Sequence, residues 1–340
     1  MTQQPSNEHL RAVAEGLVGQ VVRTITPVHG GGNNRIYKVD CADGLVALKF
    51  YPPQDEDPRD RLGQEYDALS FLTANGIGQV PTPLGLSLEH HCAAYQWIDG
   101  KRINTVQAKD VDALAGFLAQ LQDLRGLDGG ENLRPASASC FSFKDVADQL
   151  TSRFALLQKV AHDLAGSAND LQAFLDTKLL PTAEAVLTEL TDACERGRLS
   201  FDTPLAQKNL ALSPSDFGFH NALQGEDGQI TFIDFEYFGW DDPVKMISDV
   251  MLHPGSNLSP ELAIRFRDQI APIFSHDDAV FSLRLRLLYP VFGLIWCAIL
   301  LNEFLPERWA RREAAGHSGA EASRTRQLNK AFNLYQRLYL

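Results

Sequence analysis

Three oxygen-bearing side chains between residues 216 and 234 have types and spacing that suit phosphoryl transfer. Asp216 and Asn221 lie five residues apart in a loop that opens with Ser and Pro, and Asp234 follows a turn and a short apolar strand. Two short strands joined by such a turn predict a hairpin, which would bring the three side chains together. Phosphoryl transfer uses a carboxylate to orient the attacking hydroxyl, and an amide and a second carboxylate to hold Mg²⁺. We therefore expect Asp216 to be catalytic and Asn221 and Asp234 to bind the metal. The alternative is a polar hairpin loop and a helix cap, because Asp and Asn are common turn residues.

A second group of residues, near the start of the chain, has the character of a phosphate-binding element. The run Gly30-Gly31-Gly32-Asn33-Asn34 separates two predicted strands. Glycines let backbone amides approach phosphate oxygens, and successive amides form an anion-binding concavity. Gly31, Gly32, Asn33 and Asn34 are therefore candidate nucleotide-binding residues, although a glycine cluster in a hairpin turn is also common.

Lys49 lies in the apolar run Val46-Ala47-Leu48-Lys49. Burying an unpaired ammonium is costly, so this side chain must reach water or an anion, which here could be nucleotide phosphates together with a helix carboxylate. Residues 58–75 predict that helix from four apolar side chains at helical spacing. We expect Glu65 to pair with Lys49, with Asp67 as the alternative if the helix is rotated.

The bulk properties favour a two-lobed globular protein. The chain has 340 residues, 44% of them hydrophobic, and a net charge of −12, which argues against non-specific nucleic-acid binding. Five scattered cysteines without a Cys-x-x-Cys pair favour free thiols, and the polar N-terminus has no signal-peptide core, so a cytoplasmic location is expected. The most apolar run, 287–301, is short for a membrane span and contains Pro290, so we expect a buried helix and no membrane partner. Further helices are predicted over 111–124, 142–164 and 171–198, with a kink or break at Pro181 in the last.

The motifs Asp216-x-x-x-x-Asn221, Ile233-Asp234-Phe235-Glu236 and Val-Ala-Leu-Lys together resemble the aminoglycoside phosphotransferase and choline kinase family. The resemblance implies an α+β fold of the two-lobed, protein-kinase-like type, with a small antiparallel-sheet N-lobe carrying one helix and a larger, mostly helical C-lobe. Residues 1–99 would form the nucleotide-binding lobe. Residues 100–340 would form the helical lobe with the catalytic hairpin and the acceptor cleft.

The resemblance also implies an ATP-dependent small-molecule O-phosphotransferase that moves a γ-phosphate to an acceptor hydroxyl, with ATP or GTP and Mg²⁺ as cofactors. Gln96, Trp97 and Ile98 would form the hinge that meets the adenine. One departure is Pro214, which stands where the family commonly has His and could stiffen the same turn by fixing φ. The alternatives are a nucleotide-binding pseudokinase with a regulatory role, and a related enzyme that transfers another group or acts on protein.

The acceptor is predicted to lie beside Glu236, Tyr237, Trp240 and Asp241, which follow the catalytic hairpin. Carboxylates and aromatic rings suit an amine-bearing acceptor, and the same carboxylates could bind a neutral polyol or sugar. A packing interpretation is equally available, in which Asp242-Pro243 caps the next helix and the aromatic residues support the loop. The sequence leaves open the acceptor's identity, the preference for ATP or GTP, and the oligomeric state.

Overall fold

The computed structural model describes residues 6–28, 34–53, 57, 59–163, 168–197, 199–314 and 318–338. The chain folds into two compact units, each built from three segments. The first unit comprises 1–139, 211–241 and 255–270, and the second comprises 140–210, 242–254 and 271–340. This division by compactness differs from the lobe boundary after residue 99, which stays a prediction about the nucleotide-binding and helical lobes.

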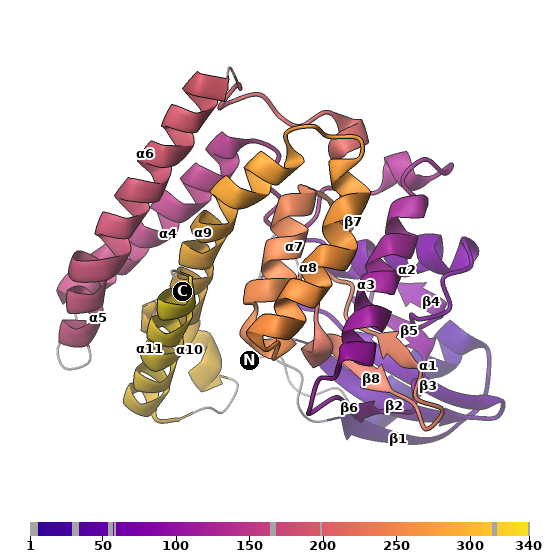
Figure 1. Ribbon diagram of the computed structural model, residues 1–340. Coiled ribbons are helices and arrows are strands. Elements are labelled where there is room, and N and C mark those ends of the chain that lie inside the picture. The colour runs from indigo at the N-terminus through magenta and orange to yellow at the C-terminus, as the bar shows by residue number, and fades with distance from the viewer. Residues whose placement is uncertain are drawn as a thin grey trace. The chain divides into compact units, whose positions relative to one another are not determined.

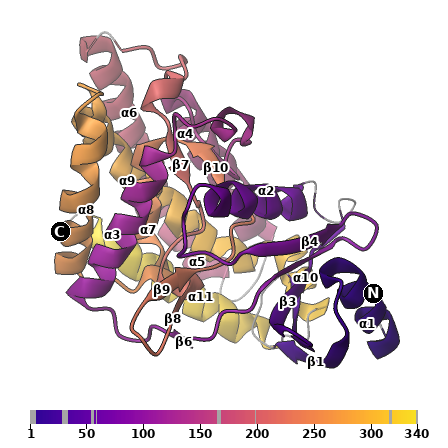
Figure 2. The same ribbon diagram turned by 90° about the vertical axis from the view of Figure 1, so that its right-hand side faces the viewer.

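A five-stranded antiparallel sheet forms the start of the first unit (Figures 1 and 2). Its strands are β1 (Val22–Val28), β2 (Arg35–Cys41), β3 (Gly44–Phe50), β4 (Pro83–Ser87) and β5 (Cys92–Gln96), in the spatial order β1-β2-β3-β5-β4. Each neighbouring pair is antiparallel. Short loops join β2 to β3 and β4 to β5, whereas α2 (Arg61–Ala74) and β4 separate β3 from β5 in the chain.

The two faces of this sheet carry different helices. Successive side chains of a strand point to opposite faces, so Val46 and Leu48 of β3 pack with α1 (Asn7–Val18) in one apolar cluster. Lys49 consequently points to the other face, which α2 covers. Asp60 begins α2 by accepting the backbone N–H of Gly63 at 3.0 Å. The alternation of side chains along β3 and the start of α2 at Asp60 therefore place Lys49 against α2.

The rest of the first unit positions the predicted catalytic hairpin. Two small sheets accompany α3 (Ala108–Asp123): a pair of β7 (Ala211–Ser213) with β10 (Gly239–Asp241), and a sheet ordered β6-β8-β9 from Lys101–Arg102, Ala222–Gln224 and Ile230–Phe232. β8 and β9 pair antiparallel, with Ala222 opposite Phe232. The predicted hairpin is present. α8 (Pro260–Ser275) begins in this unit.

The second unit is helical in the residues that the structure describes. Its helices are α4 (Phe143–Asp163), α5 (Ala168–Phe174), α6 (Leu180–Gly197), α7 (Pro243–Leu252), α9 (Phe281–Leu300), α10 (Pro306–Ala314) and α11 (Ala320–Arg337). Figure 1 shows α4, α6 and α9 running side by side, and α9 also contacts α7 and α11. α9 is therefore the central helix of this unit.

The irregularity expected at Pro181 takes the form of a widened turn. Leu175–Leu179, directly before α6, has the π-helical pattern. Proline lacks a backbone N–H and its ring crowds the carbonyl four residues earlier, so the preceding turn must open. The helical backbone continues from α5 into α6, because the single π-helical turn relieves the crowding by the Pro181 ring without breaking the helix.

α9 and the turn after it, Phe281–Phe304, form the one stretch of the described residues long and apolar enough to cross a membrane. A core helix passes the same test, and 56% of its most apolar window is buried within the protein. Leu287, Val291, Leu294 and Ala298 are among its buried residues. The sequence predicted a buried helix here, and the structure contains one.

Candidate active site

Lys49 lies at the centre of a cluster of carboxylates in the first unit. Its ammonium nitrogen Nζ donates to Oε2 of Glu65 and to Oδ1 of Asp234, at 2.6 Å in each case. A third carboxylate, that of Glu236, lies 3.9 Å from the same nitrogen. Burial acts to lower the pKa of Lys49, but the three carboxylates outweigh it and raise the pKa above its ordinary value. Lys49 is therefore held as a cation.

Glu65 joins the sheet to the segment that carries Asp234. Its Oε2 also accepts the hydroxyl of Tyr51 at 2.7 Å, and its Oε1 accepts the backbone N–H of Phe235 at 3.1 Å. Phe235 directly follows Asp234 in the chain. The buried carboxylate of Glu65 therefore holds both the ammonium of Lys49 and the backbone beside Asp234. A carboxylate that accepts three hydrogen bonds has little freedom to move.

The alternative partner, Asp67, points elsewhere. Its side chain is 62% exposed and lies 3.7 Å from Arg134. α2 thus presents Glu65, two residues earlier, to the sheet, because residues two apart on a helix do not share a face.

The catalytic hairpin brings Asn221 close to Asp234 and ties it to Asp216. The amide Nδ2 of Asn221 donates to the backbone carbonyl of Asp216 at 2.9 Å. The backbone N–H of Ile233, next to Asp234, donates to the carbonyl of Asn221 at 2.9 Å. All three predicted catalytic and metal-binding residues consequently belong to the first unit, together with Lys49. Their roles stay predictions.

Two residues of the hairpin have left-handed backbone conformations. Ser215 has φ +67° and Asp234 has φ +69°, a region that residues other than glycine seldom occupy. Such conformations cost on the order of 1–3 kcal/mol each and gather at functional sites. Pro214, in place of the family's His, is buried immediately before Ser215. Its proposed stiffening of the turn stays a prediction.

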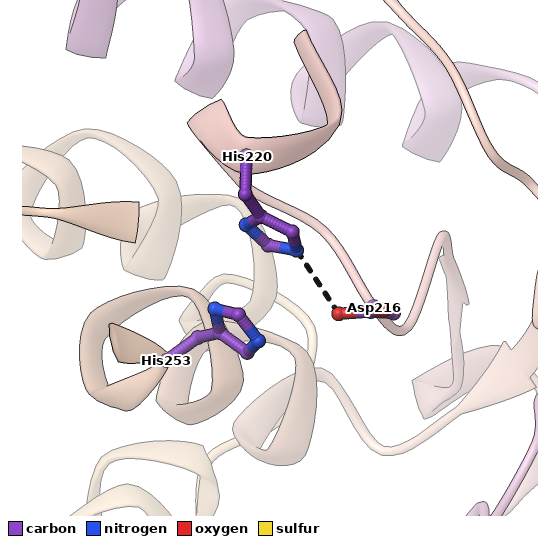
Figure 3. Close-up of side chains that lie close together, drawn as sticks. All are labelled: Asp216, His220 and His253. Atoms are coloured by element: carbon purple, nitrogen blue, oxygen red, sulfur yellow. Dashed lines mark hydrogen bonds and ion pairs between the residues drawn. The ribbon is translucent and has the colours of Figure 1, made fainter. Parts of the chain in front are cut away.

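His220, which the sequence suggests is a loop-packing residue, contacts the predicted catalytic carboxylate. Its Nε2 lies 3.0 Å from Oδ1 of Asp216, as the dashed line in Figure 3 shows. The four-residue separation, with a tight turn at Phe219–Asn221, brings the two side chains together. His253, also drawn, ends α7 in the second unit and packs edge-on against Trp296 with ring centroids 4.6 Å apart.

Glu236 belongs to a buried network that the sequence did not reveal. Arg61, the first residue of α2, donates to its Oε1 and also to Asp57. Asn34 donates to its Oε2 at 2.6 Å. Burial acts to raise the pKa of Asp57, but hydrogen bonds from Arg59 and Arg61 outweigh it and hold the pKa well below its ordinary range. Glu236 is thus fully engaged by cation and amide partners.

The glycine-rich loop is described only at its last residue. Gly31, Gly32 and Asn33 lie outside the described residues, and β1 and β2 pair up to Val28 opposite Ile36 on either side of it. Asn34 therefore provides the observed link, through Glu236, between the end of this loop and the hairpin.

The other residues predicted to bind the acceptor differ in exposure. Trp240 and Asp241 are buried in β10, where the indole N–H of Trp240 donates to the carbonyl of Gly130 at 3.0 Å. Tyr237 is half-buried, and its ring lies 5.3 Å from the guanidinium of Arg59 and 5.2 Å from that of Arg61. Cation–π contacts of this kind use the ring face that an ammonium group would need.

The predicted hinge offers few unpaired backbone donors. The N–H of Gln96 donates to Thr82 and that of Trp97 to Leu45. Among the described residues, the N–H of Ile98 has no such partner. Within the described part of the chain, Ile98 is consequently the residue of the predicted hinge whose backbone N–H is left available.

The side chains of this site suit a hard divalent cation. Asn221 and Asp234 offer amide and carboxylate oxygens, which Mg²⁺ prefers. Glu65, Asp234 and Glu236 each have an oxygen within 4.8 Å of the others, but both glutamates are buried and paired with cations. The side chain of Asp234 is 35% exposed, so it is the accessible carboxylate of the group.

Comparison with known proteins gives a family match. The model of the phosphotransferase enzyme family matches residues 24–270. No curated protein matches the sequence.

Several solved structures have the same fold. A spectinomycin phosphotransferase in complex with ADP and spectinomycin aligns with a TM-score of 0.60 and 16% identity, over 99% of this chain and 98% of that one. Choline kinase LicA from Streptococcus pneumoniae has a TM-score of 0.59 and 12% identity, over 97% and 99%. An ethanolamine kinase of Plasmodium vivax aligns with a TM-score of 0.57 and 16% identity, over 96% of this chain and 85% of that one. The expected protein-kinase-like fold and the resemblance to these kinases are confirmed.

Proposed function

The chain belongs to the phosphotransferase enzyme family, and from this premise we propose that it uses ATP to phosphorylate a hydroxyl group of a small molecule. The family match confirms the prediction of a phosphotransferase. The nucleotide, the metal and the acceptor are part of the proposal. The relatives named above act on spectinomycin, choline and ethanolamine by their names.

One observation carries the proposal. The ammonium of Lys49 is held between Glu65 and Asp234, in the same unit as Asp216 and Asn221. A buried cation beside an accessible carboxylate is the arrangement that a polyphosphate and its metal ion require. A purely structural ion pair needs neither the accessible Asp234 nor the neighbouring Asp–Asn loop.

The chemistry proposed for these residues is positioning and charge neutralisation. Asp216 orients the acceptor hydroxyl and takes its proton, with His220 holding one carboxylate oxygen. Lys49 binds nucleotide phosphates with the N–H donor that is hydrogen-bonded to Asp234 in this structure. Asn221 and Asp234 would hold Mg²⁺, which supplies positive charge at the phosphates when bound.

The contacts of Glu236 and Tyr237 bear on the acceptor. A cationic acceptor would need a free carboxylate or ring face. Both oxygens of Glu236 are engaged, and two arginines lie against Tyr237. This supports a neutral polyol or sugar over an amine recognised by these two residues.

The test is an acceptor screen with purified protein, Mg²⁺ and either ATP or GTP, in which the phosphorylated product is identified by mass. The panel contains aminoglycosides, choline, ethanolamine and common sugars. Asp216→Asn is the matched control and should lower turnover by at least about a hundredfold, as expected for loss of a general base. Nucleotide binding without transfer to any acceptor would favour the pseudokinase instead.

The cellular location is also a proposal. All five cysteines are free and buried. Free thiols are the ordinary state in a reducing cytoplasm, where we propose that the protein acts.

A further inference from the structure

Two buried tyrosines lie on the same face of the sheet as Lys49. Tyr51 comes two residues after Lys49 in the chain. Tyr95 of β5 pairs with Ala47, which comes two residues before Lys49, and residues two apart along a strand share a face. Only 5% of Tyr51 and 4% of Tyr95 is exposed, so both hydroxyls need hydrogen-bonding partners inside the protein.

The hydroxyl groups of the two tyrosines form a hydrogen-bonded chain that ends on Glu65. The oxygens of Tyr51 and Tyr95 lie 2.8 Å apart, and the Tyr51 oxygen lies 2.7 Å from Oε2 of Glu65. A carboxylate oxygen accepts hydrogen bonds, so Tyr51 donates its single hydroxyl hydrogen to Glu65 and must accept that of Tyr95. Burial raises the pKa of both hydroxyls, so each keeps the hydrogen that it donates.

The carboxylate oxygen at the end of this chain is the one that holds Lys49. Oε2 of Glu65 accepts Nζ of Lys49 at 2.6 Å, and the ring centroid of Tyr51 lies 5.0 Å from the same nitrogen. Tyr51 therefore contacts both partners of the ion pair. Its hydroxyl holds the carboxylate, and its ring faces the ammonium.

The hydrogen bond from Tyr51 matters most when Lys49 changes partners. In the proposed reaction Asp234 would bind the metal ion, and Lys49 would turn a donor from Asp234 to the phosphates. Glu65 is then the carboxylate that still orients Lys49 through a direct hydrogen bond. Because the bond from Tyr51 to Glu65 involves neither nucleotide nor metal, it holds Glu65 in place in both states.

We propose that Tyr51, supported by Tyr95, is a positioning residue for nucleotide binding: its hydroxyl fixes Glu65, and Glu65 in turn orients Lys49 towards the phosphates. This role rests on the proposed function, because Lys49 meets phosphates only in an enzyme that uses a nucleotide. A purely structural pair of hydroxyls would contribute to stability alone.

The test compares the binding of two probes by calorimetry and needs no acceptor. ADP with Mg²⁺ has phosphates for Lys49 to bind, whereas adenosine has none. Tyr51→Phe keeps the ring and removes the hydroxyl, so it should weaken ADP binding about tenfold, as for loss of a hydrogen bond to a charged group. Its affinity for adenosine should equal that of the wild type. Tyr95→Phe, one step further from Lys49, should weaken ADP binding only about two- to threefold.

Tyr66→Phe is the matched control. Tyr66 of α2 lies beside Tyr95, with ring centroids 6.4 Å apart, and its hydroxyl makes no hydrogen bond with any other residue that the structure describes. This variant should bind both probes as the wild type does.

The double variant Tyr51→Phe with Tyr95→Phe separates positioning from stability. Removing one hydroxyl leaves its partner unsatisfied, whereas removing both relieves that cost. The melting temperature of the double variant should therefore lie above that of Tyr51→Phe, while its affinity for ADP should stay as low. Recovery of ADP affinity together with the melting temperature would make the tyrosine pair structural and overturn the proposal.

The same measurements distinguish failure of this role from failure of the proposed function. If the wild type binds ADP and Tyr51→Phe binds it equally well, only the positioning role is refuted. An equal loss of ADP and adenosine binding in Tyr51→Phe would also refute it, because the phosphates would not be the part affected. If the wild type binds neither probe with Mg²⁺ present, the proposed function is wrong and the role of Tyr51 is wrong with it.

Discussion

Each unit holds a buried cation that lies between two carboxylates, Lys49 in the first and Arg284 in the second, and these two clusters differ in accessibility. In the first unit Lys49 lies between Glu65 and Asp234, and the Asp234 side chain is 35% exposed. In the second unit Arg284 lies between Asp242 and Asp278, whose side chains are 4% and 7% exposed. We call these the open cluster and the closed cluster.

The closed cluster has a clear structural task. Asp242 begins α7 by accepting the N–H of Val244 at 2.7 Å, and Asp278 accepts the N–H of Val280 at 3.0 Å just before α9. Arg284 therefore fastens the beginnings of two helices to each other. A fully enclosed pair of this kind has no path for ligand exchange.

The open cluster differs because one of its carboxylates reaches solvent. In the proposed reaction Asp234 would bind a metal ion and give up its hydrogen bond to Lys49, while Glu65 stays bonded to Lys49 and to the backbone of Phe235. Similar local chemistry thus gives a proposed reaction site in one unit and a structural clamp in the other. The predictions below test this separation.

The largest expected effect is on activity, in the open cluster. Asp234→Asn should lower phosphotransfer at least about a hundredfold, because the Mg²⁺ that would neutralise the phosphates loses an anionic ligand. The free energy of unfolding should change by less than about 1 kcal/mol, since Lys49 keeps Glu65 and Asp234 is partly solvated. Turnover and urea unfolding measure the two quantities. A large loss of stability would make this cluster structural.

In the closed cluster, the next largest effect is expected on stability and not on activity. Asp242→Asn should lower the free energy of unfolding by about 3–5 kcal/mol, because Arg284 loses one buried charge partner. The amide oxygen can still cap α7, so the helix start is preserved. Asp192→Asn, which removes an exposed partner of Arg196, is the control and should change little. An unchanged unfolding midpoint for Asp242→Asn would contradict the structural role.

Glu236 combines features of the two clusters. It lies 3.9 Å from Lys49 of the open cluster, but its side chain is as buried as the carboxylates of the closed cluster. Glu236→Gln should lower the free energy of unfolding by about 1–3 kcal/mol, the value of a hydrogen bond to a charged group. Arg61 would still keep Asp57. Chemical unfolding measures the loss. If instead only the KM for an amine-bearing acceptor rose, Glu236 would bind the acceptor and the cationic interpretation would return.

The smallest expected effect concerns His220. His220→Ala should reduce turnover several-fold, up to about tenfold, because Asp216 loses one hydrogen bond that orients it. His220→Gln keeps a side-chain donor and should recover part of the loss. Nucleotide-induced stabilisation should be the same in both variants and the wild type. Equal turnover in all three would remove His220 from the positioning of Asp216.

The sequence by itself determined the elements that place the open cluster. A lysine in an apolar strand indicated a buried ammonium that needs an anion, and the helix that follows offered Glu65 as the expected partner, with Asp67 as the alternative. The five-residue spacing of Asp216 and Asn221 and the turn after them predicted the hairpin. Each of these is a short-range pattern, set by strand, helix and turn geometry, and can be read without knowing the rest of the fold.

Only the tertiary structure decided which charges pair across long separations. Arg61 meets Glu236 across 175 residues, and Asn34 meets the same carboxylate across 202. The tertiary structure also buried Trp240 and Asp241. Such contacts depend on how a helix packs on a sheet and on which side chains this packing brings within hydrogen-bonding distance of a carboxylate. Because the local sequence around Glu236 is the same whether it faces an acceptor or an arginine, packing alone settles the choice.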